Sequence, residues 1–468
     1  MKHLSLVVAA LACVLFTGSS MSGAEELRLG RAEVDITPPP DMPFQAPQRP
    51  PFKVVTASGT HDPLHAKAVV FDAGGVRAAI VACDLTSIPV ACIHAARGHI
   101  AKMCTTPPEN VMITATHTHT GPNIRPRFFA FAPPAQKKIA ADYILRLPEL
   151  IAESVRQAEQ NLTGARLQAA LGTVPGVAFN RRFVMKDGTV VSNPHKGEDG
   201  LLGDVVRPAG PTDDALPMLY AETPDGTPLA TVFNFAMHLD TTGGDAYSAD
   251  FPYEVAKILR DVKGPDMLSL FTMGAAGNVN HYDLLNPAGP RRTKGVGEAA
   301  RIGALLAAEV VRGYGRMEPI KNAPVKVSRE VLTLQLLEEK APGLARQFGN
   351  KPEFHDGELM IRLVDGKYTF QAEVMVITVG DELAFVGLPG AMFVELGIAV
   401  KLNSPYRFTF MNTLCNGTIG YVPNRKAYGE GGYGATTATT RSNPGTGEAL
   451  VESAVRQLIA HRGRQPSP

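Results

Sequence analysis

The sequence predicts an α/β fold, in a single large domain whose mixed sheet is flanked by helices. Apolar runs rich in β-branched residues recur at 111–116, 229–237 and 268–273, and such runs are typical of buried strands. Longer stretches with helical periodicity lie between and beyond them, as at 136–160 and 298–311. We find no repeat and no linker that would separate an independent module. Strands that alternate with helices in this way favour the α/β class.

Composition agrees with an ordinary globular protein and excludes one class of partner. The 468 residues suffice for two or three average domains or for one large α/β domain, and 44% of them are hydrophobic. The formal net charge is +1 and the chain contains no long basic run. Nothing therefore indicates a nucleic-acid partner.

The first 24 residues predict a secretory signal peptide. Lys2 precedes an apolar run at 4–16, and small residues lead up to Ala24, after which we expect cleavage. The run is too short for a lasting membrane span, and no later run of about 18 apolar residues follows. The mature chain is expected to be secreted or periplasmic, with a domain at 25–462 and a disordered tail at 463–468.

Four cysteines lie beyond the signal, and their spacing matches no zinc ribbon. They are Cys83, Cys92, Cys104 and Cys415. In an oxidising compartment both disulfides and buried free thiols are compatible with a chain of this size.

Glycine and proline place the elements of the first half. A proline run ends the first strand, two glycines at 74–75 mark a hairpin turn, and Pro148 is expected to break or kink the longest helix. Pro252 suits the first turn of another helix. In chain order we expect a strand within 30–40, a loop at 38–51, hairpin strands at 66–72 and 78–84, a helix at 93–103, the strand at 111–116, the helix at 136–160, a strand at 167–174, a surface loop at 194–217, the strand at 229–237, a helix at 252–262 and the strand at 268–273.

The second half ends in a candidate active-site segment and an amphipathic helix. Residues 417–447 are rich in Gly and Thr with interspersed tyrosines, so they are expected to form a lid or wall of a site. The apolar residues of 448–461 share one helical face. The other elements expected are a helix at 298–311, strands at 373–379 and 383–387, a helix at 392–402 and a strand at 408–414.

Three predicted strands end in polar clusters that carry metal-ligating residue types. The first strand ends in His117 and His119, and in extended chain residues i and i+2 point to the same side. The other clusters are His238 with Asp240, and Asn278, Asn280 and His281. Because ligands bind beyond the strand ends of α/β sheets, these clusters are expected to converge. A catalytic zinc commonly has three ligands drawn from His and carboxylate, with water in the open position.

Each of these residues also has an ordinary structural interpretation. The two histidines of His-x-His can line a polar loop, and His238 can be a core histidine at a strand end. Asp250 precedes a Pro-led helix and is expected to be an N-cap. Of Arg181 and Arg182, only one of two neighbours in a strand is expected to face a site. His-Glu-x-x-His, Gly-x-Ser-x-Gly and Cys-x-x-Cys motifs are absent from the sequence.

The motifs resemble those of the neutral/alkaline, non-lysosomal ceramidase family. The matching stretches occur in family order over nearly the whole mature chain: 30–39, 116–122 (Thr-His-Thr-His-Thr-Gly-Pro), 179–182 (Phe-Asn-Arg-Arg), 235–238 (Phe-Ala-Met-His), 277–280 (Gly-Asn-Val-Asn) and 388–390 (Leu-Pro-Gly). The resemblance implies an α/β catalytic domain with one zinc ion that cleaves the amide of an N-acyl sphingoid base. It implies a small, amphiphilic substrate.

The resemblance also assigns residues to roles. His117 and His238 match the family's zinc histidines, and Tyr433 matches the tyrosine that completes the metal site. His119 matches the neighbouring active-site histidine, expected to act as acid/base or to orient the attacking water. Arg181 matches the arginine of the Asn-Arg motif, expected to bind a polar or anionic part of the substrate.

Three departures from the family pattern bear on the mechanism. Asn280 stands where the family has a serine, so a candidate catalytic position has changed and attack by metal-activated water is the simplest route. Ala391 stands where the family has its zinc glutamate, and losing that carboxylate should weaken metal binding. Glu395, one turn further on, and Asp240 are candidate replacements. The family's C-terminal immunoglobulin-like domain is expected to be absent.

The sequence therefore predicts a secreted, zinc-dependent hydrolase that resembles neutral ceramidase and acts on an amide or an ester of lipid-like character. The alternative is a degenerate member that keeps the fold and binds a ligand or partner. Ala391 and Asn280 favour the alternative, whereas His117, His119 and His238 favour the enzyme.

Overall fold

The computed structural model describes residues 27–45, 55–125, 129, 132–195, 203–286, 293–321 and 324–463. The predicted signal peptide and residues 464–468 of the predicted tail lie outside these ranges, so the structure does not test them. The predicted domain limits also stay predictions. No helix in the described part of the chain has the length and apolar character needed to cross a membrane.

Three mixed sheets form the centre of the described structure. The first sheet has the strand order β6 (Val111–Ala115), β5 (Val76–Cys83), β4 (His65–Ala73), β1 (Arg28–Asp35), β7 (Thr163–Gly164). The second sheet has the order β15 (Leu268–Met273), β14 (Pro228–Phe235), β13 (Ala215–Glu222), β8 (Arg166–Thr173), β17 (Glu318–Pro319). The third sheet has the order β19 (Glu353–His355), β20 (Met360–Val364), β21 (Lys367–Val379), β22 (Leu383–Gly387), β24 (Phe408–Asn412), and β18 (Val325–Gln335) also pairs with β21.

Smaller ladders flank these sheets. They are β2 (Pro43–Gln45) with β3 (Val55–Thr56), β9 (Phe179–Asn180) with β16 (Val279–Asn280), β10 (Arg182–Met185) with β11 (Val190–Ser192) and β12 (Val205–Pro208), and β23 (Ala391–Met392) with β25 (Tyr421–Val422). The helices are α1 (Val90–Met103), α2 (Pro134–Gln160), α3 (Phe251–Lys263), α4 (Val296–Tyr314), α5 (Ala341–Gln347), α6 (Val394–Asn403), α7 (Arg425–Glu430) and α8 (Thr446–Arg462), with a 3-10 turn at Pro108–Asn110.

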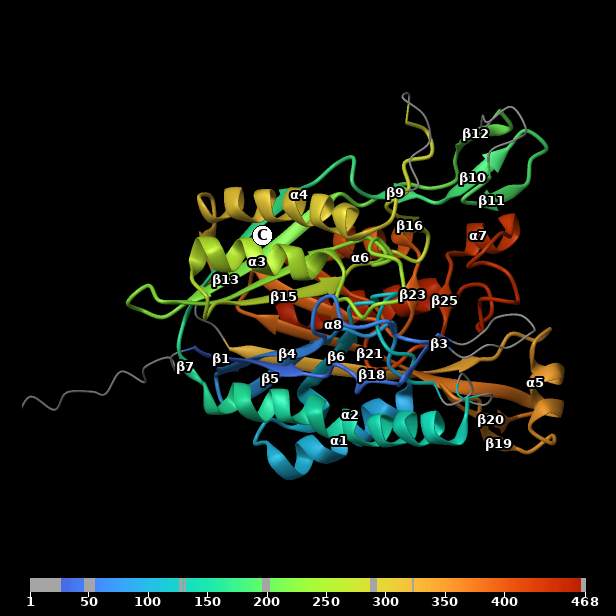
Figure 1. Ribbon diagram of the computed structural model, residues 1–468, viewed down its shortest axis with the longest axis horizontal. Helices are drawn as coiled ribbons and strands as arrows, with labels where there is room; N and C mark the ends of the chain where they lie inside the picture. Colours follow the sequence, from blue (N-terminus) through green and yellow to red (C-terminus); the bar gives the residue numbers. More distant parts are fainter. Residues whose placement is uncertain are drawn as a thin grey trace, which may run out of the picture.

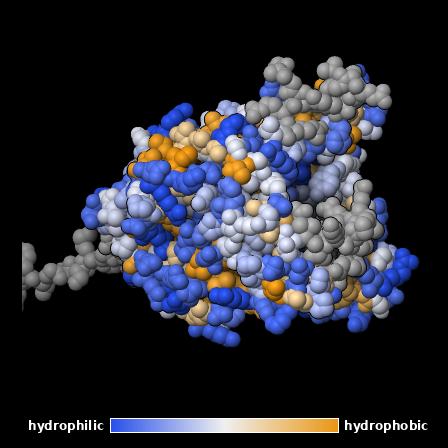
Figure 2. All heavy atoms as spheres, in the orientation of Figure 1, coloured by the Kyte–Doolittle hydropathy of each residue, from blue (hydrophilic) through white to orange (hydrophobic). Residues whose placement is uncertain are grey.

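The sheets lie between two pairs of helices. α1 and α2 cover the outer side of the first sheet, and α3 and α4 cover the outer side of the second (Figure 1). In β4, Val69 and Phe71 face the core shared by the three sheets, whereas Ala68 and Val70 face the helices. Because alternate side chains of a strand point to opposite faces, burial of both sets requires cover on both sides. On the face that Figure 2 shows, apolar side chains form small groups among hydrophilic ones.

Each large sheet contains one parallel pair joined by a helix. The units are β5–α1–β6, β14–α3–β15 and β22–α6–β24. Ligands of α/β proteins bind beyond the carboxyl ends of such strands. The loop after β24 ties these ends together, because the backbone N–H of Thr413 donates to Met273 (3.0 Å) and that of Asn416 donates to Ile113 (2.7 Å). The three sheets therefore present their strand ends to one region.

The predicted α/β class and most predicted elements are confirmed. The hairpin turn at Gly74 and Gly75 has φ values of 63° and 73°, as a type I′ turn requires. Pro148 lies inside the continuous helix α2, so the helix is not broken there. The 38–51 loop contains the short β2, and the expected 194–217 loop contains β12 and the start of β13. The four cysteines are free thiols.

Three strands of the third sheet, β18, β19 and β20, lack a counterpart among the predicted elements. β18 pairs with β21 along residues 369–379, and β20 pairs with its start at residues 367–370. β21 begins at Lys367 and not at residue 373. Many side chains of β18 and β20 are exposed or half-buried, so they lack the continuous apolar run that identifies a buried strand. The exposure of these side chains accounts for that weak signal.

Candidate metal centre

Three imidazoles meet beyond the ends of β6 and β14. One nitrogen from each of His117, His119 and His238 lies within 4.8 Å of the others. The Nε2 atoms of His117 and His119 are 3.3 Å apart, and the ring centroids of His117 and His238 are 4.6 Å apart. The predicted convergence of the first two strand ends is therefore confirmed. This cluster, in which His117 and His238 are buried and His119 is exposed, can hold a metal ion.

The two neighbouring histidines do not meet through extended strand geometry. β6 ends at Ala115, and His117 has a φ of +73°, in the left-handed region that disfavours a residue with a Cβ. The backbone N–H of His117 donates to the carbonyl of Leu85 at 2.9 Å, which anchors the turn. The prediction that both rings reach one point is correct, but its geometric reason is wrong. A strained backbone of this kind is common at functional sites.

Backbone carbonyls fix the orientation of the two most buried rings. Nδ1 of His117 donates to the carbonyl of Thr86 at 2.6 Å, and Nδ1 of His238 donates to that of Ala276 at 2.7 Å. With the proton on Nδ1, the lone pair of each Nε2 faces the cluster, as metal ligation requires. Burial lowers the pKa of His117 to about 3 and that of His238 well below its usual value. Both rings are neutral at pH 7.

A carboxylate stands behind the third ring. Oδ1 of Asp240 lies 4.0 Å from Nδ1 of His119, and Oδ2 of Asp240 forms a 2.6 Å ion pair with Lys294. Burial lowers the pKa of His119, and the charge of Asp240 opposes that shift. Asp240 thus contacts the outer side of His119 and does not enter the nitrogen cluster.

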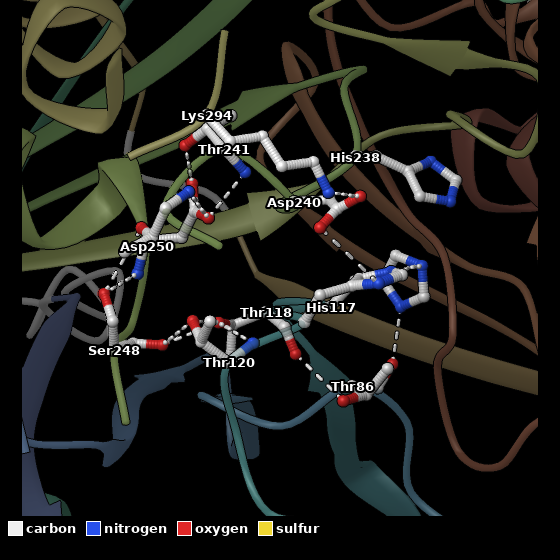
Figure 3. Close-up of polar contacts among 12 residues, drawn as sticks. Thr86, His117, Thr118, Thr120, His238, Asp240, Thr241, Ser248, Asp250 and Lys294 are labelled. Atoms are coloured by element: carbon white, nitrogen blue, oxygen red, sulfur yellow. Dashed lines mark hydrogen bonds and ion pairs between the residues drawn. The ribbon is translucent and has the colours of Figure 1, made fainter. Parts of the chain in front are cut away.

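A network of hydroxyls and a buried carboxylate joins the loops that carry the histidines (Figure 3). Oγ1 of Thr118 and Oγ1 of Thr120 donate to the carbonyl of Ser248, at 2.6 and 3.0 Å. Asp250 accepts from the backbone N–H groups of Thr241 (2.9 Å) and Phe251 (2.8 Å), the second of which starts α3. Asp250 is therefore the N-cap that the sequence predicts, and it also holds the loop after His238.

The tyrosine hydroxyl that lies against the histidines belongs to Tyr421. Its oxygen is 3.4 Å from Nε2 of His238 and accepts from Nη2 of Arg181 at 3.1 Å. Tyr433 packs edge-on against Tyr421, with ring centroids 5.2 Å apart, and 50% of its surface is exposed. Arg181 is buried, and its guanidinium lies over both tyrosine rings. Arg182 points elsewhere, to Glu430 and Phe393.

The third polar cluster contributes backbone and structural contacts. Nδ2 of Asn280 donates to Asn193 (3.1 Å), and Oδ1 of Asn280 accepts from the N–H of Tyr282. Asn278 bonds to Glu395 and to the N–H of Val394, at the start of α6. His281 contacts the carbonyl of Thr293. The expected convergence of these three side chains on the metal cluster is not observed.

Among the described residues, no carboxylate replaces the zinc glutamate that the resemblance implies at position 391. Ala391 lines the same cleft as His117 and His119. Glu395 accepts from Nδ2 of Asn278 at 2.9 Å and lies close to Gly210, so it is engaged on the far side of Asn278. In the described part of the chain, the group of potential metal ligands contains no carboxylate. The donor set is three imidazoles.

The cluster opens into a cleft of about 1020 Å³. His117, His119, Tyr421 and Tyr433 line it, and so do five further residues between 418 and 441. The prediction that 417–447 forms a wall of the site is confirmed for those residues. Two features were missing from the sequence interpretation: Tyr421, one of several tyrosines in that segment, and the ion pair between Asp240 and Lys294, which are far apart in the sequence.

Comparison with known proteins identifies the fold of the chain. No family model matches the sequence, and no curated protein matches it significantly. Among solved structures, neutral ceramidase from Pseudomonas aeruginosa matches with a TM-score of 0.69 and 20% identity over 95% of this chain and 76% of that one. A ceramidase complexed with C2 matches with a TM-score of 0.70 and 18% identity over 94% and 75%. The chain has the ceramidase fold, and the resemblance seen in the motifs is confirmed at that level.

Proposed function

We propose that the chain is a secreted, metal-dependent hydrolase that cleaves the amide bond of an N-acyl compound. The observation that carries the proposal is the meeting of three neutral imidazoles at a cleft, two of them with their Nε2 lone pairs directed inward. The ceramidase fold and the ordered motifs support the same reaction class. An ester with the same acyl group is a chemically related substrate.

The donor types fit zinc, and one pair of them has the spacing of zinc ligands. Two nitrogens bound to a tetrahedral zinc at 2.0–2.1 Å lie about 3.3–3.4 Å apart, and the Nε2 atoms of His117 and His119 are 3.3 Å apart. We assign His117 and His238 as ligands, with His119 as a third imidazole in place of the missing carboxylate at Ala391. A bound zinc ion would polarise a carbonyl and lower the pKa of water to near 7.

The protein groups around the cluster have roles that follow from their contacts. Arg181 is a buried cation beside the histidines, so it would favour negative charge that develops on a carbonyl oxygen. Tyr421 holds Arg181 and faces His238 through one hydroxyl. Asp240 lies 4.0 Å from the outer nitrogen of His119 and would favour positive charge on that ring. Tyr433, at the half-exposed edge of this group, would contact the substrate.

His119 has a second candidate role, that of general acid/base. Its side chain is 37% exposed, and the charge of Asp240, 4.0 Å from its outer nitrogen, would favour the protonated ring that a general acid needs. The zinc content of the His119→Ala variant distinguishes the two roles. If His119 is a ligand, His119→Ala loses zinc; if it is an acid/base, the variant keeps zinc and loses turnover.

The first experiment measures the zinc content of the mature protein by elemental mass spectrometry. We expect about one zinc per chain in the native protein, and loss of zinc in His117→Ala/His238→Ala. His461→Ala is the matched control, because His461 is a buried histidine bonded to Thr378 outside the cleft lining. Zinc retained by the double variant, or no zinc bound after incubation, would overturn the metal centre and favour a ligand-binding protein.

A further inference from the structure

Two arginines that line the cleft are paired with carboxylates. Nη1 of Arg125 is 2.7 Å from Oε1 of Glu358. Nη2 of Arg441 is 3.2 Å from Oδ2 of Asp356, and its Nη1 pairs with Oε2 of Glu358. Both guanidinium charges are therefore compensated by protein groups.

The two lysines at the cleft and the cluster are engaged as well. Nζ of Lys294 forms a 2.6 Å ion pair with Asp240. Nζ of Lys340, in the cleft lining, donates to the carbonyls of Thr437 (3.0 Å) and Thr440 (3.2 Å). Neither ammonium group lacks a protein partner.

Arg181 differs from these four cations, because no carboxylate of the described residues forms an ion pair with it. Its Nη2 donates to the carbonyl of Gly277 and to the hydroxyl of Tyr421 (3.1 Å), whereas its Nε is buried without a hydrogen-bond partner. Arg181 is only 8% exposed. Its neighbour Arg182, in contrast, pairs with Glu430 at 3.2 Å.

The aromatic surroundings of Arg181 compensate its charge only in part. The guanidinium carbon lies 5.4 Å from the ring centroid of Tyr421 and 5.2 Å from that of Tyr433. Such cation–π contacts are weaker than an ion pair in a buried setting. Because a buried charge is costly without an anionic partner, the arrangement indicates that a bound anion completes it.

The histidine cluster offers no such anion. Its potential ligands in the described part of the chain are three imidazoles, and Asp240 is already paired with Lys294. Ala391 contributes only a methyl group to the cleft lining. Negative charge on a reacting carbonyl oxygen would offset Arg181 only during the reaction, whereas a carboxylate of the ligand would offset it for as long as the ligand is bound.

The position of Arg181 limits where that carboxylate lies in the ligand. The hydroxyl of Tyr421 is 3.1 Å from Nη2 of Arg181 and 3.4 Å from Nε2 of His238, so one hydroxyl separates the guanidinium from the cluster. A carboxylate bound to Arg181 would therefore lie close to a carbonyl held at the cluster. An N-acyl α-amino acid has this geometry, because only the α-carbon separates its carboxylate from the amide nitrogen.

We propose that the substrate is an amide with a carboxylate beside the scissile bond, as in an N-acyl α-amino acid, and that Arg181 binds this carboxylate. Charge-assisted hydrogen bonds of this kind are about twice as strong as neutral ones. The apolar side chains of the cleft, among them Phe44, Leu344 and Phe348, are available to the acyl chain. The inference rests on the proposed function, because it takes the cluster as the place where the amide is cleaved.

Binding to the zinc-free protein is the first test, because it excludes turnover and contact of the carboxylate with a metal. Calorimetric titrations compare N-hexanoylglycine with N-hexanoylethanolamine, which has the same acyl chain and a hydroxymethyl group in place of the carboxylate. We expect N-hexanoylglycine to bind about tenfold or more tightly. Equal affinities, tighter binding of the ethanolamide, or no binding of N-hexanoylglycine would overturn the proposal.

Variants locate the preference at Arg181. Arg181→Gln should reduce the ratio of the two affinities about tenfold. Arg181→Lys keeps the charge but loses the planar fork, so it should reduce the ratio about threefold, and it serves as the test if Arg181→Gln does not fold. Lys340→Met is the matched control, because it removes a positive charge from the same cleft lining and should change the ratio less than about twofold.

Circular dichroism verifies the fold of each variant before its ratio is used. An unchanged ratio in a folded Arg181 variant would contradict the assignment. So would an equal fall of the ratio in Lys340→Met, which would show a general effect of charge in the cleft.

The outcomes also separate this inference from the proposed function. Preference for N-hexanoylglycine in the zinc-free protein, without zinc uptake or turnover, would retain the ligand class and reject the hydrolase. Zinc uptake combined with turnover of N-hexanoylethanolamine at an equal or higher rate would retain the hydrolase and reject the substrate class. A preference that appears only after zinc is added would overturn the role of Arg181.

Discussion

At Tyr421 a single hydroxyl connects a histidine of the cluster to a buried arginine. It accepts from Arg181 and faces His238, whereas Tyr433 lies one ring further out. A hydroxyl in this position both orients the guanidinium and can donate toward the cluster. The contribution of each tyrosine to the reaction therefore depends on where its oxygen lies, and not on the match to a family motif that selected Tyr433 in the sequence.

We expect Tyr421→Phe to reduce kcat/KM by about 10²-fold and Tyr433→Phe to cause a smaller loss. Three imidazoles hold the metal in our assignment, so both variants should keep zinc. Each substitution removes one oxygen and retains the ring, which makes the pair its own control. Steady-state kinetics and zinc content check the prediction. Loss of zinc in Tyr433→Phe alone would show instead that Tyr433 is a metal ligand, as the family resemblance implies.

At the scale of elements, Asp250 connects the start of α3 with the loop that follows His238. It is fully buried, caps Phe251 and accepts from Thr241 and Thr242. Its backbone has φ +63° and ψ −159°, a region that glycine tolerates and other residues adopt only under strain. The carboxylate contacts and the strained backbone oppose each other in their effect on stability.

Asp250→Ala should lower the free energy of unfolding by about 2–4 kcal/mol, because it removes the cap and leaves buried N–H groups unbonded. Asp250→Gly removes the same bonds but relieves the backbone strain, so it should be about 1 kcal/mol more stable than the alanine variant. Urea unfolding monitored by circular dichroism measures both. If the two variants unfold at the same urea concentration, the strain argument fails; if both match the native protein, the cap argument fails as well.

The elements that sequence patterns predict well are those whose signal is local. The glycine pair at 74–75 indicates a type I′ turn, which requires positive φ at both positions. The buried runs of β6, β14 and β15 give continuous apolar signals. β18 alternates exposed and half-buried residues along an edge, so its pairing with β21 depends on contacts distant in sequence. Local pattern carries no information on such a partner.

For the whole molecule, the candidate site was predictable in its histidines and not in its surroundings. His117, His119 and His238 stand out because each follows a strong strand. The pairing of Asp240 with Lys294, the contact of Tyr421 with His238, and the ion pair of Glu358 with Arg441 all join segments that the fold brings together from different sheets and loops. Asn280 was selected by family position, but its side chain bonds to Asn193 and Tyr282.

The same arrangement makes a metal ion a cross-link between sheets. His117 and His119 follow the first sheet and His238 follows the second, so an ion held by all three ties two layers of the molecule. A ligand that binds only the folded state at 100 times its Kd adds about 2.7 kcal/mol of stability. With an unfolding entropy of about 2.1 cal/mol/K per residue, this raises the Tm of a chain this long by about 3 °C.

We therefore expect a chelator to lower the Tm of the native protein by about 3 °C, and added zinc to restore it. Differential scanning calorimetry of the zinc-loaded and chelated protein measures the shift. His117→Ala/His238→Ala should show no response to either treatment, whereas His461→Ala should respond like the native protein from its own starting Tm. A zinc-dependent shift of the same size in the double variant would place the stabilising ion elsewhere. A native protein that binds zinc at the cluster without any shift would show that the unfolded chain binds the ion about as tightly as the folded one, which would contradict the cross-link.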